Sequence, residues 1–319
     1  MLIAWRVAGR IVDSGAPAIC LAICLGMGLP LAAGMGASQA AEPNLITEDL
    51  TLPAIFKGAF GSATHVNLQA TVVRPDDGAP HPLALINHGM TSEPDERHAM
   101  GPRDMLPQAE EFARRGWVAL LPMRRDYGKS GGEFAEDLTG NYCGSLGFDD
   151  EGRAAAEDLK EAARVISQQP YVDRSKMISV GVSGGGFATV ALSADPPPNM
   201  VAAINFAGGE GSSQNGMYCS FNELIGDFAT FGRHSRIPSL WVYAENDHFF
   251  SPGQARDFAK AFDDSGGKAQ LIIAPPFDDE GHYLFTAEGA PVWTKYVDDF
   301  LAAQHLDAAS LAKQAKATQ

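Results

Sequence analysis

The chain has 319 residues, of which 45% are hydrophobic and 20% charged, and its formal net charge at pH 7 is −15. This length and apolar content are sufficient for a globular domain with a sizeable core. The acidic balance argues against nucleic acid and anionic lipid as partners and favours neutral or cationic ligands.

The first forty residues differ in composition from the rest. Arg6 and Arg10 precede an apolar stretch, and Ser38 and Ala40 place small residues where a signal peptidase cleaves. The pattern predicts a signal peptide at 1–40, cleaved after Ala40, and a periplasmic or secreted mature protein. A retained membrane anchor is the alternative, but glycines and a proline interrupt the apolar stretch before it comfortably spans a bilayer.

Two cysteines, Cys143 and Cys219, lie outside this leader. In an oxidising compartment a lone pair of cysteines is expected to form a disulfide. Neither has the Cys-x-x-Cys spacing or the neighbouring histidine of a zinc site, so we predict no metal. Two unrelated thiols are the alternative.

Short apolar strands alternate with amphipathic helices through residues 41–319. Strands are expected at 67–74, which alternates like an edge strand, and at 83–87, 117–121, 177–182, 201–206, 240–244 and 269–274. Helices are expected at 105–115, ending at Gly116, and at 151–168, 187–192, 254–262 and 292–304. This order predicts one α/β domain with a largely parallel sheet covered on both faces. Ligands of such sheets bind at the carboxyl ends of the strands.

A serine in a glycine-rich turn follows one of these strands. Gly181-Val182-Ser183-Gly184-Gly185 lies between an apolar run and a helix, in the order that a nucleophile elbow requires. In so sharp a turn a Cβ at 181 or 185 would collide with neighbouring backbone. The turn also presents the serine hydroxyl at a helix N-terminus, where free N–H groups favour a developing negative charge.

An acid and a histidine follow two later strands. Asp247 comes after the strand at 240–244, and His282 follows the strand at 269–274. With Ser183 they form the chain order Ser, Asp, His, which is typical of an α/β-hydrolase. His282 would take the serine proton and Asp247 would hold the imidazole tautomer. Competing acids are Glu245, Asp278, Asp279 and Glu280.

The oxyanion of such a reaction needs backbone donors. We expect the N–H groups of Gly184 and Met90, because the loop Asn87-His88-Gly89-Met90 follows an early strand. His88 has no second ligand at metal-binding spacing, so we predict neither a metal nor another cofactor.

These motifs, with Arg125-Asp126-Tyr127-Gly128-Lys129-Ser130, resemble the α/β-hydrolase superfamily, particularly its dienelactone hydrolase-like bacterial members. The resemblance covers nearly all of residues 50–304 and implies an eight-stranded, mostly parallel sheet and a Ser-His-Asp site. Dienelactone hydrolase proper uses a cysteine nucleophile where this chain has Ser183, so lactone specificity is not implied. The Arg-x-Tyr-Gly-x-Ser stretch is also similar to that of secreted acyl peptidases and cocaine-esterase-like enzymes.

Two connections, 128–150 and 208–236, are longer than minimal hydrolase turns, and we expect them to be small cap-like insertions. Each contains one cysteine, so a bridge between Cys143 and Cys219 would tie them together near the mouth of the site. Their aromatic and methionine side chains would line that mouth, or else seal the loops against the core. These residues are Phe134, Tyr142, Phe148, Met217, Tyr218 and Phe221.

The sequence therefore predicts a secreted serine esterase that acts on a small-molecule ester through an acyl-enzyme on Ser183. The alternative is a serine peptidase or amidase on the same scaffold. A non-catalytic binding protein on the hydrolase fold is a third hypothesis, which the Ser, Asp and His at three strand ends disfavour.

Overall fold

The fold is built on one eight-stranded sheet in the order β1-β2-β4-β3-β5-β6-β7-β8. We describe it from a computed structural model, which describes residues 43–57, 62–136, 147–212 and 220–317. Strand β2 pairs antiparallel with both of its neighbours, β1 and β4, and the remaining pairs are parallel. The strands are β1 Leu45–Lys57, β2 Ala63–Pro75, β3 His81–Asn87, β4 Val118–Pro122, β5 Val172–Val182, β6 Met200–Phe206, β7 Ser239–Ala244 and β8 Ala269–Ala274.

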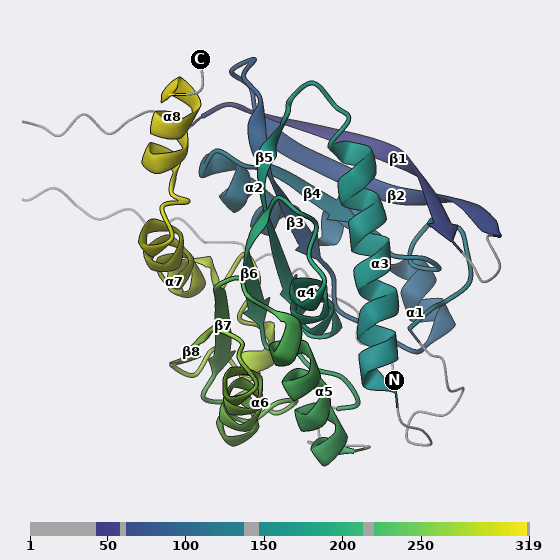
Figure 1. Cartoon of the computed structure of the whole chain (residues 1–319), viewed down its shortest axis with the longest axis vertical. Helices are drawn as coiled ribbons and strands as arrows, with labels where there is room; N and C mark the ends of the chain where they lie inside the picture. The colour runs from purple at the N-terminus through teal and green to yellow at the C-terminus, as the bar shows by residue number, and fades with distance from the viewer. Residues whose placement is uncertain (1–42, 58–61, 137–146, 213–219, 318–319) are drawn as a thin grey trace, which may run out of the picture. The chain divides into compact units, whose positions relative to one another are not determined.

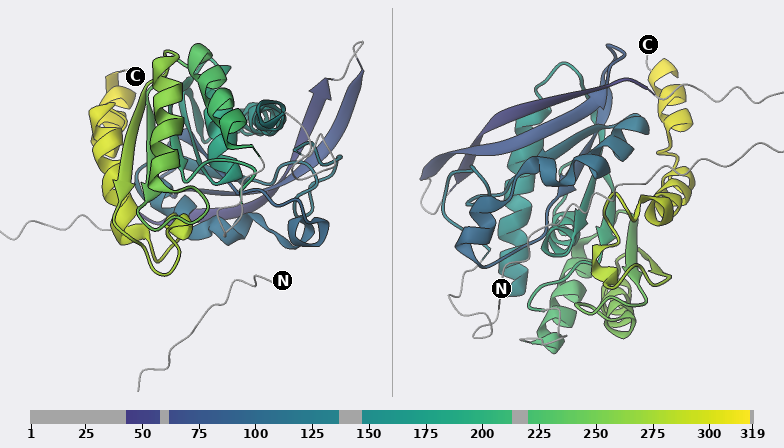
Figure 2. Two further views of the ribbon diagram at one scale, coloured as in Figure 1. Left: turned by 90° about the horizontal axis from the view of Figure 1, so that it is seen from below. Right: turned by 180° about the vertical axis from the view of Figure 1, so that it is seen from behind.

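Helices cover both faces of this sheet (Figure 1). They are α1 Pro94–Ala99, α2 Leu106–Arg114, α3 Phe148–Ile166, α4 Gly184–Ala194, α5 Phe221–His234, α6 Pro252–Asp264, α7 Ala290–Ala303 and α8 Ala308–Ala317. Helices α3, α4, α5 and α6 share one buried apolar cluster with one face of the sheet. Helices α2 and α7 share a second cluster with the other face, and Figure 2 shows the two helix layers from two further sides.

The central strands bury both of their faces. In β7, Trp241 and Tyr243 point into the first cluster, whereas Leu240, Val242 and Ala244 point into the second. A strand that is covered on both sides has no solvent face and so needs no polar alternation. This explains the continuous apolar runs of the sequence and confirms the prediction of an α/β fold with a mostly parallel sheet.

Local signals in the sequence set where several helices begin and end. Helix α6 starts in a capping box, in which the Gln254 side chain accepts hydrogen bonds from both the N–H and the hydroxyl of Ser251, at 2.8 and 2.7 Å. Pro252 occupies its first turn, where a missing N–H costs nothing. Helix α2 is followed by Gly116 at φ 85°, the left-handed conformation expected of a helix stop.

Two features of the fold differ from the sequence prediction. The sequence analysis did not predict strand β1, which forms the edge of the sheet. Residues 67–74, expected to resemble an edge strand, lie in β2, which is second in the sheet and pairs with β1. The connection 208–236 contains helix α5, whose Phe228 and Phe231 are fully buried in the core. Phe221 packs against Phe258 of α6, with ring centroids 5.6 Å apart.

None of the helices among the described residues is both long and apolar enough to cross a membrane.

Candidate active site

Ser183 lies in a sharp turn between β5 and α4. Its backbone has φ 56° and ψ −127°, outside the regions that non-glycine residues ordinarily occupy. The turn is held from both sides, since the Ser183 N–H donates to the carbonyl of Phe206 and its carbonyl accepts the N–H of Phe187, both at 3.0 Å. Backbone strain of this kind persists only where the surrounding structure enforces it, and it is characteristic of functional sites.

Glycine at 181 and 185 is what permits this turn. A Cβ at Gly181 would lie 2.1 Å from the carbonyl oxygen of Gly185, and one at Gly185 would lie 2.2 Å from the carbonyl oxygen of His88. Both distances are far inside van der Waals contact. The prediction that neither position has room for a side chain is confirmed.

Asp247 and His282 meet at the carboxyl ends of β7 and β8. Oδ2 of Asp247 lies 3.3 Å from Nδ1 of His282, and both side chains are at least nine-tenths buried. The other carboxylate oxygen of Asp247 accepts the N–H groups of Phe249 and Phe250 at 2.9 and 2.8 Å. The Phe249 ring stacks on the imidazole of His282 with centroids 4.2 Å apart. The imidazole is therefore held at one nitrogen and along one face.

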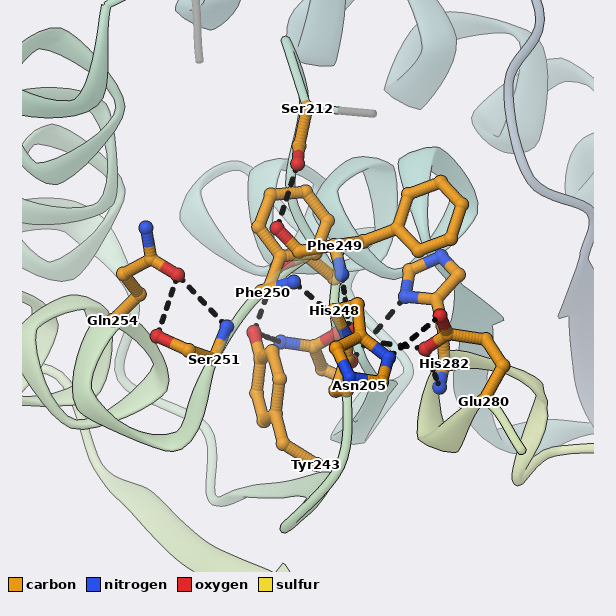
Figure 3. Close-up of polar contacts among 12 residues, drawn as sticks. Asn205, Ser212, Tyr243, His248, Phe249, Phe250, Ser251, Gln254, Glu280 and His282 are labelled. Carbon is orange, nitrogen blue, oxygen red and sulfur yellow. Dashed lines mark hydrogen bonds and ion pairs between the residues drawn. The ribbon is translucent and has the colours of Figure 1, made fainter. Parts of the chain in front are cut away.

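Glu280 holds the loops of Asp247 and His282 together. Its Oε1 accepts the backbone N–H groups of both His248 and His282 at 3.0 Å, and its Oε2 lies 3.1 Å from Nδ1 of His248 (Figure 3). Of the competing acids, Glu280 is thus a backbone acceptor and Asp247 is the carboxylate that contacts the His282 ring.

The segment that follows β3 approaches the serine closely. A Cβ at Gly89 would lie 3.5 Å from Cβ and 4.0 Å from Oγ of Ser183. Met90 lies beside the first residue of α4, because its backbone N would be 3.0 Å from a Cβ on Gly184. The two residues predicted as oxyanion donors, Met90 and Gly184, are therefore neighbours next to Ser183.

A buried ion pair that the sequence analysis missed supports this segment. The Arg124 guanidinium donates to the carbonyls of His88 and Gly89 at 2.8 and 3.2 Å. It also pairs with Glu136, whose second oxygen accepts from Arg124 Nη2 at 2.9 Å and from the Tyr127 hydroxyl at 3.1 Å. Charged residues in a loop suggest solvent exposure, and no signal in the sequence indicated that these two are buried.

His88 is part of the same support. Its Nε2 accepts the N–H of Arg124 at 3.2 Å, and its Nδ1 lies 2.7 Å from the carbonyl of Gly89. Burial, together with the nearby charge of Arg124, holds the pKa of His88 well below its usual range. His88 is therefore a neutral ring that fixes the course of the loop.

Contacts connect the serine to the histidine across the site. The Gly209 N–H points to the carbonyl of Ser183 at 3.4 Å. Gly209 in turn lies close to the Phe250 ring, which a Cβ at Gly209 would meet at 2.5 Å. The centroid of the Phe250 ring lies 5.8 Å from that of His282. The hydrogen bonds among the described residues do not include one from Ser183 Oγ to His282. In enzymes without substrate such bonds are often long and tighten only when substrate binds.

Several predicted features lie outside the described residues. These are the leader at 1–40, both cysteines of the predicted bridge, Cys143 and Cys219, and the lining residues Tyr142, Met217 and Tyr218. Of the remaining lining residues, Phe134 packs edge-on against Tyr127 and under the guanidinium of Arg97. Phe221, the first residue of α5, packs against Phe258 of α6. These contacts favour the alternative in which the aromatic side chains seal the loops against the core.

The sheet order and the strained strand-to-helix turn define an α/β-hydrolase. The chain belongs to the dienelactone hydrolase family, which it matches over residues 98–313. The expectation from the resemblance is therefore confirmed at the level of the family and the fold.

Three comparisons place the chain among known proteins. It is 26% identical to Dipeptidyl-peptidase 5 of Porphyromonas gingivalis over 185 residues, which are 54% of this chain and only 24% of that longer protein. Its fold is similar to an esterase from Pyrococcus furiosus, with a TM-score of 0.56 at 16% identity over 81% of this chain and 90% of the other. An acetyl xylan esterase from Paenibacillus sp. R4 has a TM-score of 0.53 at 16% identity over 82% and 89% of the two chains.

Proposed function

We propose that this hydrolase cleaves carboxylic esters of small molecules through an acyl-enzyme intermediate on Ser183. The observation that carries the proposal is the strained turn at Ser183, on the sheet edge where Asp247 contacts His282. Membership of the dienelactone hydrolase family and the likeness in fold to two esterases support the ester class.

His282 would carry the proton transfers of the proposed reaction. With its Nδ1–H donated to Asp247, its Nε2 is free to accept the hydroxyl proton of Ser183 as Oγ attacks the acyl carbon. The ester C–O bond then breaks, and the alcohol leaves with the proton that His282 returns. A water molecule, activated by the same nitrogen, hydrolyses the acyl-enzyme and restores the serine.

The N–H groups of Gly184 and Met90 would stabilise the oxyanion of both steps. Gly184 begins α4, so its N–H lies at the positive end of that helix, where the first N–H groups have no partner within the helix. Met90 depends on the Arg124 network for its position, since Arg124 holds the two carbonyls that precede it.

The test combines covalent labelling with turnover. We expect a fluorophosphonate to label the wild-type protein and chromogenic acyl esters of different chain length to be hydrolysed, and Ser183→Ala to lose both activities. Without labelling or ester turnover in the folded wild-type protein, the proposal would be rejected in favour of a binding protein.

A peptidase is the second candidate, because the chain shares 26% identity with a part of Dipeptidyl-peptidase 5. Aminoacyl anilides, assayed beside the esters with the same Ser183→Ala control, separate the two. Turnover of anilides with an efficiency comparable to that of esters would favour the peptidase.

We further propose that the chain is exported after cleavage at Ala40 and that Cys143 and Cys219 are then bonded to each other. The charged and apolar pattern of residues 1–40 supports export. Intact mass spectrometry of the protein from the cell envelope, with and without reductant, tests both statements. A mass that includes residues 1–40, or two free thiols, would contradict them.

A further inference from the structure

Glu210 is a buried acid beside the candidate active site. It follows β6 on a loop that begins with Ala207 at φ 46° and ends with Gly211 at φ 70°, and the residue is only 7% exposed. The loop is held on both sides of Glu210. The Gly209 N–H points to the carbonyl of Ser183 at 3.4 Å, and the Ser212 hydroxyl donates to the carbonyl of Phe249 at 2.6 Å (Figure 3).

The carboxyl group points to the position of the proposed oxyanion donors. Its Oε1 lies 2.6 Å from the point that a Cβ on Gly184 would occupy, and the backbone N of Met90 lies 3.0 Å from the same point. Glu210, Met90 and Gly184 thus converge on one place next to Ser183. Glycine at 184 is what leaves room for the acid there.

The Glu210 carboxyl has no hydrogen-bond or ion-pair partner among the described residues, although the nearby acid Glu136 has three donors. The guanidinium of Arg124 is already engaged by Glu136 and by two backbone carbonyls. Its oxygens are not among the fully buried side-chain atoms without a partner in the part of the chain that the structure describes. The carboxyl group is therefore open to a substrate atom as its hydrogen-bond partner.

The surroundings favour the neutral acid. The charged and titratable groups that face Glu210 are Glu151 on α3 and Arg124, Tyr127 and Glu136 on the segment after β4. Burial, then the charges of Glu151 and Glu136, hold the pKa of Glu210 well above its usual range, and Arg124 opposes them only in part. This direction favours the protonated carboxylic acid, the form that can donate a hydrogen bond, over the carboxylate.

We infer that Glu210 is a catalytic residue that, as a neutral carboxylic acid, donates a third hydrogen bond to the substrate carbonyl oxygen as it becomes an oxyanion. This inference rests on the proposed esterase function. An ionised carboxylate at the same place would repel the oxyanion and slow the reaction. A buried carboxylic acid held neutral is, by contrast, a strong donor to a developing negative charge.

Two substitutions test the role of the proton. Glu210→Gln keeps the shape and an N–H donor but cannot ionise, whereas Glu210→Leu keeps the bulk and removes the donor. For a chromogenic ester we expect kcat of the Gln variant within about tenfold of wild type and kcat of the Leu variant about a hundredfold lower, with KM little changed in both. Glu288→Gln, at an exposed position, is the matched control and should behave like wild type.

The pH dependence supplies a readout that a merely structural role would not change. Wild-type kcat/KM should decline at high pH as Glu210 loses its proton, and this decline should be absent in Glu210→Gln. Infrared difference spectra between these two proteins at pH 7 should contain the C=O band of a protonated carboxyl group, a measurement that does not depend on turnover.

Three results would overturn the inference. One is a carboxylate band in place of the protonated one. A second is equal loss of kcat in the Gln and Leu variants with an unchanged pH profile, which would mean that Glu210 only supports the loop. The third is that the wild-type protein prefers substrates with an ammonium group and that Glu210→Gln loses this preference. Glu210 would then be an ionised group that binds cations. A wild-type protein that neither reacts with fluorophosphonate nor hydrolyses esters would instead refute the proposed function, and the donor role with it.

Discussion

Asp247 and His282, 35 positions apart in the chain, meet with Oδ2 of the carboxylate 3.3 Å from Nδ1 of the ring. The carboxylate is oriented by its own loop, since its other oxygen accepts two backbone N–H groups. It is therefore aimed at the imidazole before any substrate binds. Because a carboxylate accepts, this preorganisation assigns the donor role to Nδ1, and Nε2 is the nitrogen available for the proposed proton transfer.

Asp247→Asn should lower kcat for a chromogenic ester by about 10³-fold to 10⁴-fold at pH 7. The amide keeps the geometry but presents an N–H group to Nδ1, which favours the tautomer that cannot accept the serine proton. Steady-state kinetics measures the effect, and circular dichroism checks the fold. The control is Asp279→Asn, which changes an exposed acid three residues before His282. Equal activity of the two variants would exclude Asp247 from the reaction.

Glu280 should act mainly through the two loops that it joins. Glu280→Ala removes the acceptor of two backbone N–H groups, so we expect the free energy of unfolding in urea to fall by about 2 kcal/mol. We also expect kcat to fall by about tenfold, because His282 is less well positioned.

Two further variants separate this role from the surface ion pair of Glu280. Glu280→Gln retains a carbonyl acceptor and should be milder. His248→Ala removes a side chain that is 59% exposed and should change stability by less than about 0.5 kcal/mol. A Glu280→Ala protein as stable as wild type would show that the two N–H groups find other acceptors.

Much of the fold could be predicted, because the central strands are buried on both faces and thus appear as uninterrupted apolar runs. Strand β1 escaped prediction for a physical reason. Pro53 interrupts its alternating pattern, and a proline ordinarily argues against a strand. The structure tolerates Pro53 because β1 is the edge of the sheet and pairs only with β2.

Helix α5 could have been predicted from the sequence, because Leu224, Phe228 and Phe231 recur at helical spacing on its buried face.

The candidate site could be predicted only in part. Ser183, Asp247 and His282 each follow an apolar strand, and the carboxyl ends of parallel strands share one edge, so their placement at that edge was foreseeable. The burial of Arg124 and Glu210 was not foreseeable, because each is a charged residue in a loop. That burial depends on contacts with distant segments, which local sequence patterns do not encode.

The elbow glycines should tolerate no side chain. In Gly181→Ala the new Cβ would meet the carbonyl oxygen of Gly185 at 2.1 Å, so the backbone must shift. We expect a loss of about 3 kcal/mol or more in stability together with loss of activity. Gly226→Ala is the matched control, since no atom lies within 4 Å of its Cβ and the residue is inside α5. It should gain about 0.5 to 1 kcal/mol. Thermal denaturation of both variants tests the contrast, which a stable, active Gly181→Ala protein would contradict.

Asp227 on α5 should make stability depend on pH. Burial raises its pKa to about 7, with further repulsion from Asp149 and Glu223, and its Oδ2 is buried without a hydrogen-bond partner among the described residues. The folded protein therefore keeps a proton that the unfolded chain loses near pH 3.8. Between these two values stability falls as pH rises, and above about pH 7 the full penalty remains.

Asp227→Asn removes this penalty because the amide does not ionise. We expect the variant to match wild type near pH 3.5 and to exceed its stability by about 1 to 2 kcal/mol at pH 8, an amount reduced by the partial exposure of the side chain. Urea denaturation at several pH values measures the difference, and Asp257→Asn, at an exposed position of α6, should show no such trend. A difference between Asp227→Asn and wild type that stays constant from pH 4 to pH 8 would mean that Asp227 ionises normally in the folded protein.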